Sequence, residues 1–161
     1  MSETTSVEDM RPTGGCQCGA VRFAATGPFK VAICHCRMCQ KAFGNYFAPL
    51  VTAKSVEWTR GEPAVFRSSN HAQRGFCAKC GTPLVYLGDD DWAPEIAGGA
   101  FDDPSALPPT IQINVKDRVA FFGMLTDVPH HTNVDKEAAF NATVTSCQHP
   151  DHDTATWPPT S

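Results

Sequence analysis

Seven of the eight cysteines in this 161-residue chain fall into three tight clusters, and this pattern constrains the fold more than any other feature. The clusters are "GGCQCGAV", "ICHCRMCQ" and "FCAKCGT", which contain Cys16 and Cys18, then Cys34, Cys36 and Cys39, then Cys77 and Cys80. A tetrahedral zinc ion takes four Cys or His ligands. The clustered cysteines therefore supply one complete set of four ligands and a remainder of three.

The flanking glycines indicate which clusters pair. The segment "FCAKCG" resembles a zinc knuckle, a tight turn whose backbone N–H groups point at sulfur and which needs a second pair of ligands. The glycines of "GCQCG" permit the unusual backbone angles of such a partner. We therefore expect a closed, structural zinc site formed by four cysteines: Cys16, Cys18, Cys77 and Cys80. Cys34, Cys36 and Cys39 then form a second site with an open position, the feature that separates catalytic from structural zinc.

The fourth ligand of the three-cysteine site is an open question at this stage. The protein candidates are His35, His71, His130, His131, Cys147, His149 and His152. His35 lies between two ligands, so we expect its side chain to point away from the metal. His130, His131, His149 and His152 lie in polar surroundings and are expected to be solvated. Cys147 is the main alternative, because the tail could fold back over the site at a cost in conformational entropy.

Composition excludes several classes of protein. The formal net charge of −4 and the pI near 5.8 argue against nucleic acid as the main partner. The N-terminal segment "MSETTSVEDMRPT" has neither the basic region nor the apolar run of a signal peptide, and no segment approaches the length of a membrane span. We expect a soluble, cytoplasmic protein. A reducing compartment and the strain of a bridge within C-x-C both favour metal ligation over disulfides.

The rest of the chain predicts a mainly β, antiparallel, single-domain fold. Short apolar or alternating runs are bounded by turn residues: "AVRFAA", "KVAI", "YFAPLV", "SVEW", "AVFRSS", "RGF", "PLVYLG", "IQINV" and "RVAFFGML". Helical signal is limited to "RMCQKAF" and "VDKEAAFNA". We expect a flexible N-terminus over residues 1–12, a zinc-binding β domain over 13–142 and a disordered tail over 143–161, where polar residues, Pro and Thr dominate.

Taken together, these motifs resemble the glutathione-dependent formaldehyde-activating enzyme family. The resemblance runs from "GGCQCGAVRF" through "CHCRMCQKAFGNYF" and "FCAKCGTPLVY" to "GGAFDDPSALPP". It implies a zinc-stabilised β-tent fold with two zinc ions, a structural one at Cys16, Cys18, Cys77 and Cys80 and a catalytic one at Cys34, Cys36 and Cys39. It also implies that glutathione and formaldehyde combine to S-hydroxymethylglutathione, a carbon–sulfur lyase reaction run in reverse.

Several other side chains are candidates for this chemistry. Arg37 and Lys41 flank the open site and could bind the carboxylates of glutathione, although ordinary surface charge is the commoner role. His71, Asp102 and Asp103 are acid–base candidates, although Asp-Asp-Pro is more often a turn. The aromatic residues near these motifs are expected in the core rather than in a pocket: Phe43, Tyr46, Phe47, Phe76 and Tyr86. The alternative function is a non-catalytic binding module in which both zinc ions are structural and the tail caps the second.

Overall fold

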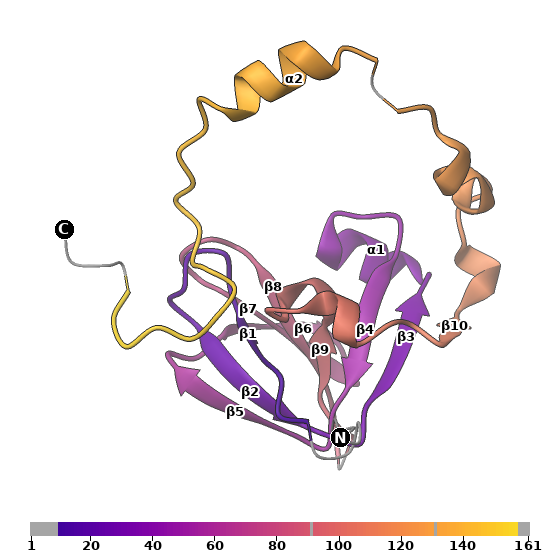
Figure 1. The fold of residues 1–161 in the computed structure, drawn as a ribbon. Helices are drawn as coiled ribbons and strands as arrows, with labels where there is room; N and C mark the ends of the chain where they lie inside the picture. The colour runs from indigo at the N-terminus through magenta and orange to yellow at the C-terminus, as the bar shows by residue number, and fades with distance from the viewer. Residues whose placement is uncertain (1–9, 91, 131, 158–161) are drawn as a thin grey trace, which may run out of the picture.

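The computed structural model describes residues 10–90, 92–130 and 132–157, and these form a mainly β domain with two sheets (Figure 1). The smaller sheet has the order β1-β2-β5, with β1 at Thr13–Gly15, β2 at Arg22–Thr26 and β5 at Ser55–Arg60. The larger sheet has the order β10-β3-β4-β9-β8-β7-β6. Its strands are β3 (Lys30–Cys34), β4 (Ala48–Thr52), β6 (Ala64–Ser69), β7 (Ala72–Phe76), β8 (Pro83–Gly88), β9 (Glu95–Ala97) and β10 (Ile111–Ile113).

Pairing in both sheets is antiparallel with one exception, which corrects the purely antiparallel prediction. Strand β10 pairs in parallel with β3, and the backbone N–H of His35 continues the pairing with the carbonyl of Ile113 at 3.1 Å. The two connecting 3₁₀ turns, η1 (Gly98–Ala100) and η2 (Pro104–Ala106), form part of the long connection that precedes β10. A connection of this length can bring a strand in beside β3 in the same direction, which a tight hairpin cannot.

The core contains residues from both sheets. Phe23 of β2 is fully buried and makes edge-to-face contacts with Phe101 and Trp58, at ring distances of 5.2 and 6.0 Å. Val51 of β4 and Ile96 of β9 are buried in the same cluster. Burying each large apolar side chain contributes about 1.5–3 kcal/mol, so this cluster fixes the two sheets against each other.

Helix α1 (Arg37–Phe43) confirms the helix predicted from "RMCQKAF". Its N-cap is Cys36, whose sulfur accepts the backbone N–H of Cys39 at 3.4 Å. It ends at Gly44, which has the left-handed φ of 58° that favours glycine at the end of a helix. The helix therefore starts within the second cysteine cluster, and its N-cap and first turn carry two of the three cysteines.

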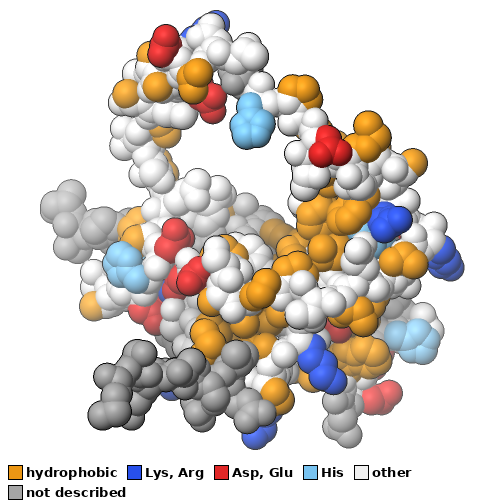
Figure 2. All heavy atoms as spheres, turned by 45° about the vertical axis from the view of Figure 1, so that its right-hand side comes forward, with side chains coloured by type: hydrophobic (Ala, Val, Ile, Leu, Met, Phe, Trp, Pro, Cys, Tyr) orange, Lys and Arg blue, Asp and Glu red, His pale blue; other side chains and the backbone are white. Residues whose placement is uncertain are grey.

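The segment after β10 first runs along the body and then continues as an arm that stands clear of the sheets (Figures 1 and 2). It contains η3 (Val115–Asp117), η4 (Phe122–Asp127) and helix α2 (Val134–Asn141), which confirms the second predicted helix. The strand predicted over "RVAFFGML" is wrong. Phe121 packs edge-on against Tyr46, and Phe122 packs edge-on against His35 and Phe47, so successive aromatic residues contact the body instead of alternating across a sheet. Among the described helices, none has the length and apolar character needed to cross a membrane.

Candidate metal centres

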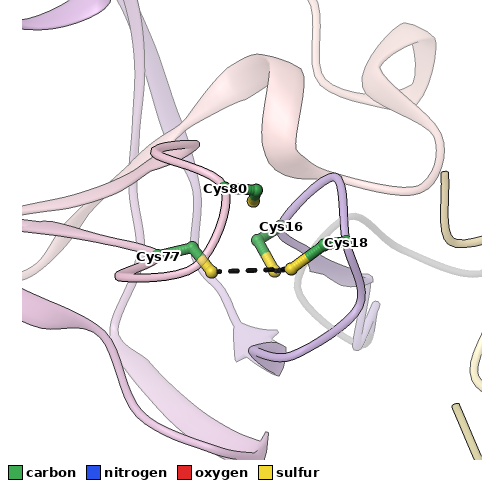
Figure 3. Close-up of side chains that lie close together, drawn as sticks. All are labelled: Cys16, Cys18, Cys77 and Cys80. Atoms are coloured by element: carbon green, nitrogen blue, oxygen red, sulfur yellow. Dashed lines mark hydrogen bonds between the residues drawn. The ribbon is translucent and has the colours of Figure 1, made fainter. Parts of the chain in front are cut away.

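The structure brings together the four sulfur atoms that the sequence predicts for the closed site (Figure 3). The sulfur of Cys18 lies 3.6 Å from that of Cys16 and 3.7 Å from that of Cys77, and Cys80 completes a group within 4.8 Å. A tetrahedral ion with Zn–S bonds of about 2.3 Å places its sulfur ligands about 3.8 Å apart. The spacing of this cluster therefore fits zinc.

Two backbone turns present these cysteines. Cys16 and Cys18 lie in the turn between β1 and β2, where the N–H of Val21 points at the Cys16 sulfur at 3.3 Å. Cys77 and Cys80 lie in the turn after β7, which closes through the N–H of Gly81 and the carbonyl of Cys77 at 2.8 Å. These are the knuckle-like turns expected from "GCQCG" and "FCAKCG".

The thiols of Cys16 and Cys80 have pKa values shifted in opposite directions. Burial raises the pKa of Cys16 to about 12. Burial also acts to raise the pKa of Cys80, but hydrogen bonds from the Thr82 hydroxyl and backbone outweigh it and lower the value to about 6. A cation that binds all four sulfurs must therefore displace a proton from a buried thiol, so metal affinity at this cluster depends on pH.

Residues 148–157 pack over the four-cysteine cluster, which corrects the expectation that His149 is solvated. The N–H of His149 bonds to the carbonyl of Gln17 at 2.9 Å, and the indole N–H of Trp157 bonds to the carbonyl of Cys18. The rings of His149 and Trp157 contact each other at 4.8 Å. His149 is buried rather than solvated because aromatic packing and these hydrogen bonds compensate the ordering of the chain.

A buried ion-pair network joins this segment to the body. Arg22 is only 3 % exposed, and its guanidinium makes a bidentate pair with Asp102 at 2.8 and 2.6 Å. Asp153 accepts two further hydrogen bonds from Arg22, at 3.0 and 2.6 Å. Burial acts to raise the pKa of Asp102, but the hydrogen bonds from Arg22 and Thr13, together with the positive charge of Arg22, outweigh it and hold the pKa below its usual range.

The structure does not bring the predicted acid–base candidates to the three-cysteine cluster. Asp102 is held by Arg22 and lines a cavity of about 400 Å³ beside Cys16 and Cys80. Asp103 caps η2 through the N–H of Ser105. His71 is exposed and contacts Asn70. Each of these candidates therefore has a local structural partner or lies at the surface, and the capping role of Asp103 agrees with the turn interpretation of Asp-Asp-Pro.

Cys34, Cys36 and Cys39 form the second cluster, with all three sulfurs within 4.8 Å of one another. Cys34 ends β3, Cys36 caps α1 and Cys39 lies in its first turn. Cys34 and Cys39 are each only 3 % exposed. Within the part of the chain that the structure describes, no fourth His, Cys, Asp or Glu joins this group.

The candidate fourth ligands lie elsewhere. The ring of His35 is fully buried and turned to Gln112 and Phe122, with Nε2 2.9 Å from the Gln112 Oε1 atom, so it does not join the cluster. Cys147 is exposed and lines a hollow with Gln17 and Cys18, beside the other cluster. His130 and His152 are exposed, and His131 lies outside the described residues. The tail therefore covers the four-cysteine cluster and leaves the three-cysteine cluster uncapped by Cys147.

Two polar residues that sequence reasoning missed contact the second cluster. The amide of Asn114 donates to the Cys34 sulfur at 3.4 Å, and the guanidinium of Arg74 donates to the Cys39 sulfur at 3.5 Å. A hydrogen bond from Cys39, with others that include Asn114, lowers the pKa of Cys34 to about 5, and the same shared proton raises that of Cys39. The only sequence signal for Arg74 was its position just before "FCAKC".

Arg74 also lines a groove between α1 and strands β6 to β8. Two adjoining hollows of about 460 and 290 Å³ share Ala42, Phe66 and Arg74. Arg37 and Lys41 lie along the larger hollow with Met38, so the two cations that the sequence singled out face the same groove. Among the described residues that line it, three are cations and none is acidic. This groove can hold an anionic molecule with an apolar part.

The aromatic residues expected in the core are not fully buried. Phe43 and Phe76 line the smaller hollow, and the ring of Tyr86 lies under Arg74 with 5.2 Å between the guanidinium carbon and the ring centre. Phe47 is partly buried against Phe122, and Tyr46 is 52 % exposed. The core prediction therefore holds only for Phe43, which is partly buried against both core clusters although it also lines the hollow.

Comparison with known proteins gives a fold and a family. A crystal structure of a Rhodobacter sphaeroides protein, solved as a structural genomics target, matches with a TM-score of 0.50 at 21 % identity. The match covers 62 % of this chain and 98 % of that one. The family model described as "Glutathione-dependent formaldehyde-activating enzyme" matches residues 11–117, which contain both cysteine clusters. The chain therefore belongs to the glutathione-dependent formaldehyde-activating enzyme family.

Proposed function

We propose that this protein is a zinc-dependent enzyme of carbon–sulfur chemistry, similar to S-(hydroxymethyl)glutathione synthase and classed with the carbon–sulfur lyases. Glutathione or another small thiol binds at Cys34, Cys36 and Cys39 and adds to formaldehyde or a related carbonyl compound. The observation that carries the proposal is the three-cysteine cluster, which has no fourth protein ligand among the described residues and lies beside a cationic groove.

The donor set determines what the site could do. A zinc ion held by Cys34, Cys36 and Cys39 would supply an open position for an exogenous thiol and would favour its thiolate form. Free in solution at pH 7, a thiol is only about 3 % ionised. Asn114 and Arg74 donate hydrogen bonds to the cysteine sulfurs and so offset part of the negative charge of the cluster.

The groove supplies the second requirement, which is orientation. The cationic side chains of Arg37, Lys41 and Arg74 are placed to bind the carboxylates of a small anionic thiol. Holding a thiol and a carbonyl compound together can supply roughly 7–11 kcal/mol of the barrier reduction. We assign most of the rate enhancement to this orientation, because lowering the pKa of a thiol also lowers its nucleophilicity.

The proposal extends to the remaining features of the protein. Cys16, Cys18, Cys77 and Cys80 hold a structural zinc, so that each chain binds two zinc ions in a β-tent fold. The protein acts in the cytoplasm on small molecules and not on nucleic acid. The alternative is a non-catalytic module with two structural zinc ions, and it requires Cys147 to cap the second cluster. The position of Cys147 beside Cys18 favours the enzyme.

Native mass spectrometry with and without excess glutathione tests this function. We expect two zinc ions per chain and a glutathione adduct on the zinc-loaded form. Cys36→Ser should abolish the adduct, whereas the control Cys147→Ser should keep both the adduct and the zinc. Two zinc ions with no adduct for any cellular thiol would refute the thiol-binding proposal. Loss of one zinc from Cys147→Ser would favour the binding module.

A further inference from the structure

The proposed addition of a thiol to a carbonyl compound needs a group that moves one proton. The thiol must lose its proton before sulfur attacks, and the alkoxide formed by the attack must gain one. Neither Arg74 nor Asn114 can do this, because a guanidinium does not deprotonate in proteins and an amide does not titrate. A side chain that carries this proton within the site is therefore to be sought among the other groups on the same side of the molecule.

Strand register places a carboxylate in a row with Arg74. Arg74 of β7 lies directly opposite Tyr86 of β8, and Tyr86 lies directly opposite Glu95 of β9. Residues that face each other across paired strands project from the same side of a sheet. Arg74, Tyr86 and Glu95 therefore form one row across three neighbouring strands, and Arg74 at one end contacts the Cys39 sulfur.

The same register places the cysteines on this side of the sheet. Glu95 lies opposite Thr52 of β4, and Cys34 lies opposite Ala48 of the same strand. Ala48 and Thr52 are an even number of residues apart, so they project from one face. Glu95 and Cys34 therefore share the face that carries the three-cysteine cluster.

The surroundings of Glu95 are suited to proton transfer. Its side chain is partly buried and accepts a hydrogen bond at 3.4 Å from the indole N–H of Trp92, a residue that is largely exposed. Burial raises the pKa of Glu95, the negative charge of Cys34 raises it further, and the Trp92 hydrogen bond and the positive charge of Arg74 act in the opposite direction. Burial and the charge of Glu95 raise the pKa of Tyr86. A carboxyl group whose pKa moves toward neutrality is a better proton carrier at neutral pH.

We propose that Glu95 is the proton carrier of the three-cysteine site, and this inference rests on the proposed function. The Glu95 carboxylate takes the S–H proton of the bound thiol. The sulfur then forms a bond to the carbonyl carbon, and the C=O π electrons move to oxygen. The resulting alkoxide takes the proton back from the Glu95 carboxylic acid. The sum is thiol plus aldehyde giving the S-hydroxyalkyl product, with no further reactant.

Proton release on thiol binding tests this role independently of turnover. Glutathione is titrated calorimetrically into zinc-loaded protein in two buffers of different ionisation enthalpy, which counts the protons released to solvent. The wild type should release close to none, because Glu95 retains the proton. Glu95→Gln should bind glutathione and release about one proton per thiol, while the rate of product formation falls by roughly 10²–10⁴. Glu62→Gln, at an exposed glutamate, is the matched control and should behave like the wild type.

Each outcome decides between the two proposals. Equal proton release from wild type and Glu95→Gln, with equal glutathione binding, would overturn the role of Glu95 and leave the proposed function standing. A wild type that binds no thiol would overturn both. If Glu95→Gln fails to fold, infrared difference spectra of the wild type replace it. Thiol binding should then produce a carboxylic-acid C=O band that shifts in D₂O, and absence of this band would overturn the inference.

Discussion

Arg22 pairs with both Asp102 and Asp153, and we predict that neutralising the first costs more folding stability than neutralising the second. Asp102→Asn removes the charge that makes the bidentate pair, and Asp102 is 14 % exposed. Breaking a buried pair by neutralising one partner costs about 3–5 kcal/mol, because the remaining charge is left without compensation. Asp153 still contacts Arg22 in this variant, so we expect about 3 kcal/mol, at the lower end of that range.

Asp153→Asn is the matched comparison on the same arginine. Asp153 is 51 % exposed, and exposed ion pairs contribute about 1 kcal/mol or less. For a chain of this length, each kcal/mol shifts Tm by roughly 2–4 °C. We therefore expect Asp102→Asn to lower Tm by roughly 6–12 °C and Asp153→Asn by no more than about 4 °C. Both values apply at one fixed, saturating zinc concentration, because metal binding itself raises Tm.

The effect of Asp102→Asn should depend on pH with a definite sign. Arg22 holds the pKa of Asp102 below its unfolded value in the folded state. The stabilisation is therefore present above an unfolded pKa of about 3.9 and is lost as the pH falls through the folded pKa. Thermal unfolding of both variants at neutral pH, and of Asp102→Asn and wild type at decreasing pH, measures these differences. Equal effects of the two substitutions at neutral pH would refute the reasoning, as would a gap between wild type and Asp102→Asn that widens in acid.

Three further predictions concern the clusters and the groove. Cys77→Ser should lose one zinc and unfold much of the domain, since structural zinc contributes about 10–16 kcal/mol in zinc-finger peptides. Metal analysis and circular dichroism check this, with Cys147→Ser as the control. A folded Cys77→Ser chain with two zinc ions would contradict it. Gly19→Ala should destabilise the chain by about 1–2 kcal/mol and expose Trp157, because Gly19 has a φ of 71° and an added Cβ would collide with His149 and Trp157. Tryptophan fluorescence and the unfolding midpoint measure this, and no change in either would count against it. Arg74→Met should weaken glutathione binding by about tenfold because a charge-assisted hydrogen bond is lost, while both zinc ions stay bound. Calorimetry measures the affinity, with Arg74→Lys as the comparison. Unaltered affinity in Arg74→Met would exclude Arg74 from glutathione binding.

The cysteine clusters were predictable because their chemistry is encoded by local spacing. "GCQCG" and "FCAKCG" each form a short turn, and the sulfurs of the two turns meet as the spacing predicted. Short helices and most strands were predictable for the same local reason. The parallel pairing of β10 and the 3₁₀ turn at Phe122 depend on contacts between distant segments, which local periodicity does not encode.

The surroundings of the sites were not predictable for the same reason. Arg74 and Glu95 are ordinary strand residues until the register of β7, β8 and β9 places them in one row. His149 is buried because a polar segment packs over Gln17 and Cys18, distant from it in sequence. The boundaries at residues 13–142 and 143–161 stay predictions, although the contacts of residues 148–157 join part of the second segment to the first.

X-ray absorption spectroscopy at the zinc edge tests the central claim most directly, because it counts sulfur neighbours. The protein without added thiol should show between three and four sulfur ligands per zinc, averaged over a four-cysteine and a three-cysteine site. Addition of glutathione should raise the average to four sulfur ligands per zinc. Any oxygen or nitrogen ligand that fills the open position before the addition should then disappear from the spectrum. An average of four sulfurs before any thiol is added, with no change afterwards, would show that both zinc sites are closed and would contradict an open catalytic site.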